Sequence, residues 1–267
     1  MALDVRSNLA KLFSLEGKVV LLTGAAGGIG RELAVSLAKV GATMALADIA
    51  MDELNVVEKE ITDLGGTAKS FFVDLMDLSS LKALTDEVIT AYGKIDALIN
   101  NAGINKRERL EVADEDSYEK ILGINLKSVH FLSQEVVKHM KEAGTGSIVN
   151  VTSYNSVMML GGCGLYGASK SGVAALTRAQ AIELAKFGIR SNALTPGHIQ
   201  TPLTAPLWSD PVRSKFLLDR IAMNRPGTPK DLVGMTVLLV SDASAYMSGM
   251  MYVVDGGSLA GGQPWEI

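Results

Sequence analysis

Short runs of apolar, often β-branched residues alternate along the chain with longer stretches whose apolar residues recur at helical spacing. The apolar runs predict strands over residues 18–24, 43–49, 69–75, 96–103, 146–153, 189–197 and 250–257. The helical spacing predicts helices over residues 31–40, 51–64, 78–92, 115–143 and 165–187. Because crossover helices join parallel strands, this order predicts an α/β fold with a doubly wound parallel sheet of about seven strands and helices on both faces.

The alternation continues from about residue 17 to residue 257 without a linker, a low-complexity segment or an internal repeat. We therefore expect one domain over residues 1–267, with residues 1–15 as an N-terminal extension. Residues 198–226 interrupt the alternation after a strand end and contain four prolines. Ligands of open α/β sheets bind beyond the carboxyl ends of the strands, so we interpret this segment as a substrate lid. The alternative is a pair of surface helices.

The composition is typical of a soluble globular protein, with 48% hydrophobic residues and a formal charge of −4. That charge favours neither nucleic acid nor an anionic membrane as a partner. The single Cys163 excludes an intramolecular disulfide, and the three histidines, His130, His139 and His198, show no metal-ligand spacing. The N-terminus lacks the apolar core of a signal peptide, and no apolar run is long enough to span a membrane. We expect a cytoplasmic protein without a bound metal.

A glycine-rich turn separates the first predicted strand from the first predicted helix. It reads Thr23-Gly24-Ala25-Ala26-Gly27-Gly28-Ile29-Gly30. Glycines permit positive φ and a close approach of the backbone to a pyrophosphate, and the helix that follows offers free amides and the positive end of its dipole. The turn is a candidate phosphate-binding site, and the alternative is a tight connection without a ligand.

Asp48 ends the second predicted strand, 18 residues after Gly30. A carboxylate at this place can accept hydrogen bonds from both hydroxyls of an adenosine ribose and would repel a 2′-phosphate. Neither the turn nor residues 49–51 contain an Arg or Lys that could neutralise such a phosphate. The sequence therefore predicts NAD rather than NADP, and the alternative is that Asp48 only caps a helix.

Tyr166 and Lys170 lie four residues apart at the start of a predicted helix and so share one of its faces. A phenol with a pKa near 10 is a poor base at neutral pH, but an adjacent ammonium stabilises the phenolate. Lowering that pKa by roughly three units takes about 4 kcal/mol, which Lys170 and an oxidised nicotinamide could supply together. Ser153, at a strand end, could orient the reacting oxygen. Without the glycine turn, the Tyr and Lys would be an ordinary surface pair.

Taken in order, these motifs resemble those of the short-chain dehydrogenase/reductase family over nearly the whole chain. The turn TGAAGGIG matches T-G-x-x-x-G-x-G, Asn100-Asn101-Ala102-Gly103 matches N-N-A-G, and Tyr166 with Lys170 matches Y-x-x-x-K. The resemblance implies a Rossmann-type fold, a nicotinamide cofactor, and reversible conversion of an alcohol to a carbonyl compound.

The resemblance also implies a role for each matching residue. Tyr166 would be the general acid/base, and Lys170 would lower its pKa and bind the nicotinamide ribose. Ser153 would polarise the substrate oxygen. Asn125 would hold a water that links the lysine to solvent, and its alternative is a buried helix asparagine satisfied by the backbone.

For the cofactor, the resemblance assigns Asp74 and Leu75 to the adenine and residues 101–103 to the adenosine ribose. Ile199 and Thr201 match positions that bind the nicotinamide carboxamide, whereas Asn100 is expected to be structural. The full expected cofactor set is Thr23, Gly24, Gly28, Ile29, Gly30, Asp48, Asp74, Leu75, Asn101, Ala102, Gly103, Tyr166, Lys170, Pro196, Gly197, Ile199 and Thr201.

The substrate is expected between the loop after Gly103, the segment from Ser153 to Tyr166, and residues 198–226. Three cations follow Gly103, namely Lys106, Arg107 and Arg109. They could meet a carboxylate or a polyhydroxylated chain, or form a solvated loop. The segments NNAGINKR, FSLEGKVVLLTG and DGGSLAGG are similar to those of gluconate 5-dehydrogenases and related sugar-acid or polyol members of the family.

The middle segment offers a different substrate wall. Its apolar residues Met158, Met159, Leu160 and Cys163 could face a cyclic or aliphatic alcohol, and core packing is their alternative. His198 could face the substrate, or be a loop histidine without an acid/base role.

Two other functions compete with a sugar-acid or polyol dehydrogenase. One is a 3-oxoacyl-carrier-protein reductase, against which Asp48 counts because those enzymes usually prefer NADPH. The other is an NAD-binding sensor or scaffold without turnover, against which the complete catalytic set counts. A serine hydrolase is disfavoured because residues 167–171 do not form a nucleophile elbow. The resemblance also implies a homotetramer, built partly from residues 115–143 and 165–187, with a C-terminal tail that could reach a neighbouring subunit.

Overall fold

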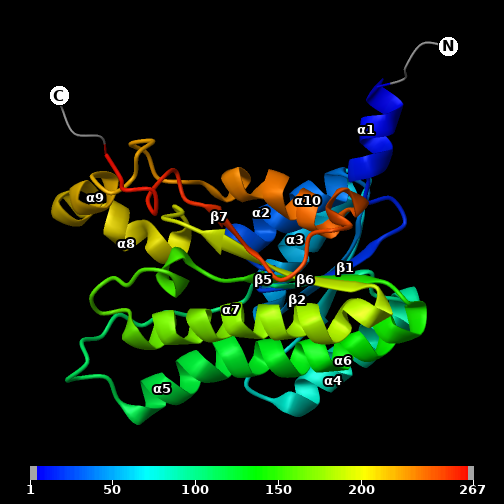
Figure 1. Cartoon of the computed structure of the whole chain (residues 1–267). Helices are drawn as coiled ribbons and strands as arrows, with labels where there is room; N and C mark the ends of the chain where they lie inside the picture. Colours follow the sequence, from blue (N-terminus) through cyan, green and yellow to red (C-terminus); the bar gives the residue numbers. More distant parts are fainter. Residues whose placement is uncertain (1–4, 264–267) are drawn as a thin grey trace.

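A seven-stranded parallel sheet forms the centre of the computed structural model, which describes residues 5–263 (Figure 1). Its strand order is β3-β2-β1-β4-β5-β6-β7, with each neighbouring pair parallel. The strands are β1 (Val19–Thr23), β2 (Thr43–Asp48), β3 (Thr67–Phe72), β4 (Ala97–Asn100), β5 (Gly146–Val151), β6 (Ile189–Pro196) and β7 (Met251–Val254). The predicted α/β fold and all seven predicted strands are confirmed.

The strands read as unbroken apolar runs because both faces of the sheet are buried. In β1, Val20 and Leu22 belong to one hydrophobic cluster, and Val19 and Leu21 belong to the cluster on the opposite face. All five residues of this strand are buried. The core therefore consists of two layers that share the sheet.

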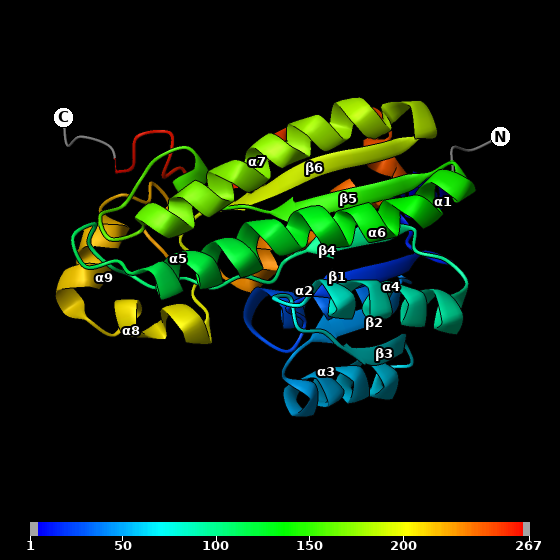
Figure 2. The same cartoon turned by 90° about the horizontal axis from the view of Figure 1, so that it is seen from below.

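Helices cover each face of the sheet (Figure 2). One cluster contains Leu33, Leu54 and Leu239, which come from α2 (Gly28–Lys39), α3 (Met51–Asp63) and α10 (Val233–Val240). The other contains Leu81, Leu132 and Leu184. These three come from α4 (Leu78–Tyr92), α6 (Ser128–Ala143) and α7 (Gly164–Leu184).

The helices differ from the prediction in two places, at residues 115–143 and at α10. The helix expected over 115–143 is divided into α5 (Glu115–Leu122), a π-helical segment (Gly123–Lys127) and α6. The π-helical segment contains no proline, and its single Gly123 is tolerated within a helical pattern, so the sequence predicted one continuous helix. Helix α10 was not predicted, because its sequence, VGMTVLLV, is apolar on nearly all sides and lacks a helical period.

The order of the strands reverses at β1, which pairs with both β2 and β4. Ligands of open α/β sheets bind at such a switch point, beyond the carboxyl ends of the strands. Residues 198–226 lie at this edge and include α8 (Ala205–Trp208) and α9 (Pro211–Leu218). The segment is thus a pair of short helices placed over the candidate site.

The N-terminal extension contains α1 (Val5–Phe13), while its residues 1–4 lie outside the described part of the chain. Within residues 5–263, none of the helices combines the length and the apolar character needed to cross a membrane.

Candidate active site

A groove of about 500 Å³ lies beyond the carboxyl ends of β1, β2 and β4. Its wall brings together side chains and backbone from the glycine turn, the end of β2 and the loop after β4. Ten of the expected cofactor residues line it: Gly24, Gly28, Ile29, Asp48, Asp74, Leu75, Asn101, Ala102, Gly103 and Thr201. The structure therefore brings most of the sequence-predicted cofactor set to one surface.

The glycine turn has a backbone that other residues could adopt only under strain. Gly24 and Gly28 have φ values of +68° and +55°. A Cβ at Gly30 would lie 1.9 Å from the carbonyl oxygen of Gly24, so α2 packs directly against the turn. No side chain caps the start of α2, which leaves its first N–H groups facing the groove without a side-chain acceptor among the described residues. A pyrophosphate fits this combination of close backbone and free donors.

Thr23 and Gly30 lie behind the groove rather than on its wall. The Thr23 hydroxyl accepts hydrogen bonds from the backbone N–H groups of Asn101 and Ala102, at 3.1 and 3.2 Å. These contacts join the turn after β1 to the loop after β4. In this structure both residues shape the groove from outside it.

The Asp48 carboxylate stands at the end of β2 and holds two backbone groups. One oxygen accepts from the N–H of Ala26 in the glycine turn, and the other from the N–H of Ala50, each at 3.1 Å. Asp48 therefore supports the turn as well as lining the groove. The lining residues include the two carboxylates Asp48 and Asp74 and contain neither Lys nor Arg.

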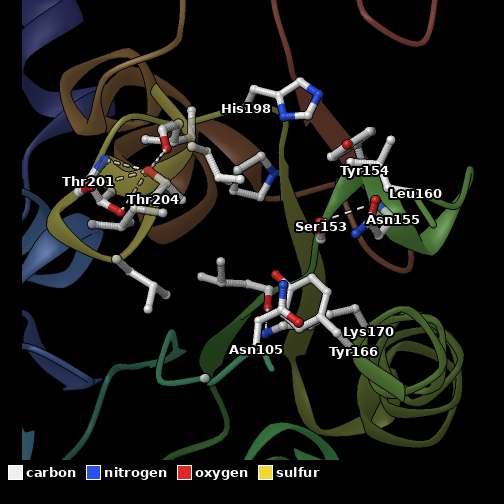
Figure 3. A pocket seen from close by; sticks show the side chains of 18 of the residues that line it. Asn105, Ser153, Tyr154, Asn155, Leu160, Tyr166, Lys170, His198, Thr201 and Thr204 are labelled. Carbon is white, nitrogen blue, oxygen red and sulfur yellow. Dashed lines mark hydrogen bonds between the residues drawn. The ribbon is translucent and has the colours of Figure 1, made fainter. Parts of the chain in front are cut away.

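A second cavity, of about 360 Å³, adjoins the groove and contains three of the four predicted catalytic side chains (Figure 3). The fourth, Asn125, lines neither space. The two spaces share the wall residues Ile29, Asn101, Gly103, Ile104, Thr201 and Leu203. Ser153, Tyr166 and Lys170 line the second cavity, together with Pro196, Gly197 and Ile199 at the end of β6. A molecule in the groove can thus extend to the catalytic side chains.

Lys170 follows Tyr166 by one helical turn at the start of α7, where Lys170 is buried and Tyr166 is half-buried. The Nζ atom of Lys170 donates to the carbonyl oxygen of Val151 at 2.8 Å and lies 5.9 Å from the centroid of the Tyr166 ring. Burial lowers the pKa of Lys170 from 10.5 to about 8, so its ammonium persists at neutral pH.

The pKa of Tyr166 changes in the direction opposite to the sequence argument. Burial raises it, and the hydrogen bond with Ser153 lowers it by less. The protein by itself therefore keeps the phenol neutral, as a proton donor. Ser153 is only 6% exposed, and its Oγ also accepts from the N–H of Asn155 at 3.2 Å.

Asn125 lies in the π-helical segment and is fully buried. Its amide pairs with both backbone groups of Ile104, accepting from N–H and donating to C=O at 2.8 Å each, and donates to Ser169 Oγ at 3.1 Å. Both donors are used, but one lone pair of Oδ1 remains. A Cβ on Gly103 would be 3.2 Å from both Asn125 Oδ1 and Lys170 Nζ, so the two polar groups flank this glycine.

Polar atoms without partners gather around the second cavity. Within the described residues, eight buried side-chain N or O atoms have no hydrogen-bond partner, and five of these belong to residues that line this cavity. The five are Asn105 Oδ1, Tyr154 OH, Asn155 Oδ1, His198 Nε2 and Trp208 Nε1. Buried polar groups are normally paired, so the concentration at one cavity indicates a space that receives a polar ligand.

His198 lies across the cavity from Tyr166 (Figure 3). Its ring packs on Tyr154, with centroids 4.6 Å apart, and meets Trp208 edge to face at 6.3 Å. Burial, assisted by the positive charge of Arg107, lowers the pKa of His198 from 6.5 to about 4. The imidazole is therefore neutral at physiological pH, and each residue of this aromatic wall has one polar atom without a hydrogen-bond partner among the described residues.

Only one of the three cations after Gly103 lines the cavity, namely Arg107. Lys106 turns away and binds Glu108 at 2.6 Å and Ser117 Oγ at 2.7 Å. Arg109 is exposed and lies 3.9 Å from Glu111. Of the two alternatives for this segment, the solvated loop describes Lys106 and Arg109, and contact with the cavity describes Arg107.

The apolar wall expected from residues 158–163 is also reduced. Leu160 lines the cavity, whereas Met158, Met159 and Cys163 do not. Met159 is half exposed with its end against Gly167, and Cys163 is buried beside Asn105. Core or surface packing, the alternative for these three residues, describes them better.

Sequence reasoning missed several wall residues. Tyr154 and Asn155 follow Ser153 in a 3₁₀ turn, and Trp208 ends α8. The chain has only two tryptophans, and one of them stands in a proline-rich insertion after a strand end. That combination could have drawn attention to Trp208, but nothing local marked the other two.

A family model and two named relatives each match most of this chain. A family model described as Enoyl-(Acyl carrier protein) reductase matches residues 24–258. The chain is 40% identical over 251 residues to the 2-dehydro-3-deoxy-D-gluconate 5-dehydrogenase of Dickeya dadantii, covering 93% of this chain and 98% of that protein. It is 38% identical over 244 residues to a 3-oxoacyl-[acyl-carrier-protein] reductase of Thermotoga maritima, covering 91% and 98%.

Solved structures resemble this one over nearly the whole fold. The crystal structure of a gluconate 5-dehydrogenase from Burkholderia cenocepacia, in complex with NADP and tartrate, superposes with a TM-score of 0.91 at 32% identity. The similarity covers 94% of this chain and 99% of that one.

Proposed function

The chain belongs to the short-chain dehydrogenase/reductase family, and we propose that it is an NAD-dependent oxidoreductase that interconverts a secondary alcohol and a ketone in a sugar acid or a polyol. Its membership makes it an NAD(P)-dependent enzyme of the family. The choice of substrate rests on one observation, the five unpaired polar atoms around the second cavity.

Those five atoms suit hydroxyl groups because they include both donors and acceptors. Trp208 Nε1 can only donate, the Oδ1 atoms of Asn105 and Asn155 can only accept, and the Tyr154 hydroxyl can do either. A hydroxyl group also donates and accepts, so a polyhydroxylated chain can satisfy all of them. A fatty acyl chain would leave them unpaired, at about 1–3 kcal/mol for each atom. Arg107 adds a cation for a carboxylate.

The catalytic side chains divide the work of proton transfer. Tyr166, neutral in the protein by itself, donates its proton to the ketone oxygen in reduction and takes it back in oxidation. Ser153 hydrogen-bonds the same substrate oxygen and orients it. Lys170 supplies positive charge beneath the phenol, and Asn125 offers its remaining lone pair to a water that leads to solvent. A bound nicotinamide supplies the hydride acceptor or donor.

The preference for NAD follows from the charge of the groove. Asp48 and Asp74 are the charged side chains of its wall, so a 2′-phosphate would meet two carboxylates and no cation there. The Burkholderia cenocepacia structure contains NADP, which makes cofactor choice the feature to measure first.

Two further features belong to this proposal. Residues 198–226 act as the lid of the substrate cavity, since Trp208 of α8 and Leu217 of α9 form part of its wall. The protein assembles as a homotetramer that uses the outer faces of α5, α6 and α7. Sedimentation of the full chain tests the assembly, and a monomer would contradict it.

The decisive experiment follows the absorbance of reduced nicotinamide in both directions of the reaction. Each of NAD and NADP is offered with gluconate, other sugar acids, polyols and simple secondary alcohols, and NADH and NADPH with the matching ketones and an acetoacetyl thioester. We expect turnover of a sugar acid or polyol with NAD. Faster reduction of the acetoacetyl thioester would favour an acyl reductase instead. Binding of NADH without turnover of any compound would favour a sensor.

A further inference from the structure

The C-terminal tail, residues 255–263, runs along the end of α9, where the substrate lid returns to the sheet (Figure 1). The sequence suggested that this tail reaches a neighbouring subunit. In the structure its described part contacts the same chain, and residues 264–267 lie outside the described residues. We propose that the tail fixes the hinge of the lid, with Gln263 as the positioning residue.

Gln263 binds three carbonyl groups at the end of α9. Its side-chain Nε2 donates to the carbonyl oxygen of Ile221 at 2.8 Å and to that of Leu218 at 3.4 Å. Its backbone N–H donates to the carbonyl oxygen of Asp219 at 3.4 Å. Two of these carbonyls already accept backbone hydrogen bonds, Leu218 from the N–H of Ile221 and Ile221 from the N–H of Asn224. Gln263 therefore adds hydrogen bonds from the tail to the segment that ends and follows the lid helix.

Glycines let the tail backbone lie directly on the hinge. A Cβ at Gly256 would lie 2.9 Å from Ile221 Cγ2, and one at Gly262 would lie 3.1 Å from Arg220 Cα. Both glycines have positive φ, +63° and +78°. The carbonyl oxygen of Gly256 also accepts a hydrogen bond from the N–H of Met223 at 3.0 Å. The tail therefore follows the hinge at backbone contact distance on both sides of Ile221.

The hinge is connected to the substrate cavity through Leu217. This side chain is 3% exposed and lines the cavity, one to four residues before the carbonyls that Gln263 binds. At the other end of the tail, a Cβ on Gly197 would lie 2.6 Å from Asp255 Cα, and Gly197 also lines the cavity. The tail thus links two parts of the cavity wall, the end of β6 and α9.

This arrangement makes the tail a determinant of substrate binding rather than of proton transfer. Neither Gln263 nor the tail glycines line the cavity or the cofactor groove. Loss of the hydrogen bonds that Gln263 makes would free α9 without disturbing Tyr166, Lys170 or Asp48. The expected result is weaker substrate binding with unchanged cofactor binding.

The test uses the full chain with Gln263→Glu and Gln263→Ala. Glutamate keeps the size of the side chain but places acceptor atoms against carbonyl oxygens, whereas Gln263→Lys restores a donor and should rescue. Asn55→Ala, at an exposed amide on α3 that lines neither the cavity nor the groove, is the control. Amide hydrogen exchange of residues 211–223 reports on the hinge directly and needs no substrate.

In Gln263→Glu and Gln263→Ala we expect faster exchange in residues 211–223, no change in β1, and unchanged NADH affinity. With the substrate identified under the proposed function, KM should rise roughly tenfold, the factor expected for one or two lost hydrogen bonds, with kcat within about twofold. If amide hydrogen exchange of residues 211–223 is unchanged in Gln263→Glu, the proposal that the tail fixes the hinge is wrong. Because exchange is measured without substrate, failure of the proposed function would leave this result standing.

Discussion

The buried ammonium of Lys170 leads to a prediction about stability that does not depend on the substrate. Lys170 is 3% exposed, and within residues 5–263 no carboxylate forms an ion pair with it. Burial lowers its pKa from 10.5 to about 8. That difference corresponds to about 3 kcal/mol by which burying the charge destabilises the folded protein at neutral pH.

We expect Lys170→Met to be more stable than the wild type at neutral pH. Methionine is about as long as lysine without its ammonium, so the variant avoids the cost of burying a charge. It also leaves the Val151 carbonyl without the hydrogen bond that Lys170 now donates at 2.8 Å. Losing that donor costs about 1–2 kcal/mol, so the net gain in the free energy of unfolding is about 1–2 kcal/mol.

The gain should disappear at alkaline pH. Between pH 8 and 10.5 the unfolded wild-type chain binds more protons at this lysine than the folded chain does, so its free energy of unfolding rises with pH. The methionine variant has no such rise. Above about pH 10 the lost hydrogen bond is the difference that remains, and the variant becomes the less stable protein.

Urea unfolding followed by circular dichroism, without cofactor and at equal chain concentration, measures both effects at pH 7 and at about pH 10. Lys230→Met, at an exposed lysine, is the control and should change stability by less than about 0.5 kcal/mol. A methionine variant that is less stable at pH 7, or that keeps the same advantage at both pH values, would refute the reasoning.

Three other predictions concern the site. Tyr166→Phe removes the proton donor but keeps the ring, so kcat should fall by about 10³-fold with NADH affinity unchanged in a fluorescence titration; activity within tenfold of the wild type would contradict the assigned role. Ile49→Arg places a cation on the groove next to Asp48, and the preference for NADPH over NADH, measured as the ratio of kcat/KM values, should rise about tenfold; no change would remove the charge argument. Burial holds the pKa of His198 near 4 against 6.5, so the unfolded chain binds more protons between these values and stability is lost as pH falls through that window. His198→Phe should flatten this loss in urea unfolding between about pH 7 and pH 4.5, and an unchanged slope would show that other groups cause it.

The strands of the sheet could be predicted from the sequence because their burial on both faces requires continuous apolar runs. A strand such as β1 must be apolar at every position, so a run of Val and Leu is the expected sequence. The same logic failed for α10, whose apolar residues surround the helix and carry no period. It also failed at the π-helical segment, where the widened turn around Asn125 has no sequence period of its own.

The site was predictable where motifs fix the backbone and unpredictable where tertiary contacts fix a side chain. The glycine turn and the end of β2 are set by strand and helix geometry, so their residues lie on the expected groove. Lys106 belongs to a loop, and its contacts with Glu108 and Ser117 decide where its side chain points. No local pattern could show that, of the three cations after Gly103, Arg107 would line the cavity.

The pKa of Tyr166 could not be predicted from the identity of the neighbouring residues alone. The sequence argument joined two positive charges, Lys170 and an oxidised nicotinamide, to lower the pKa of the phenol. In the protein without cofactor, burial outweighs the hydrogen bond with Ser153 and raises that pKa. The ammonium of Lys170 stands 5.9 Å from the ring centroid and donates its hydrogen bond to Val151 rather than to the phenol. The phenol therefore remains an acid until a further positive charge enters the groove. Under the proposed function, such a site would couple its proton chemistry to cofactor occupancy. Without the cofactor Tyr166 holds a proton to donate, and the positive charge of an oxidised nicotinamide would favour its phenolate, which would then serve as the base.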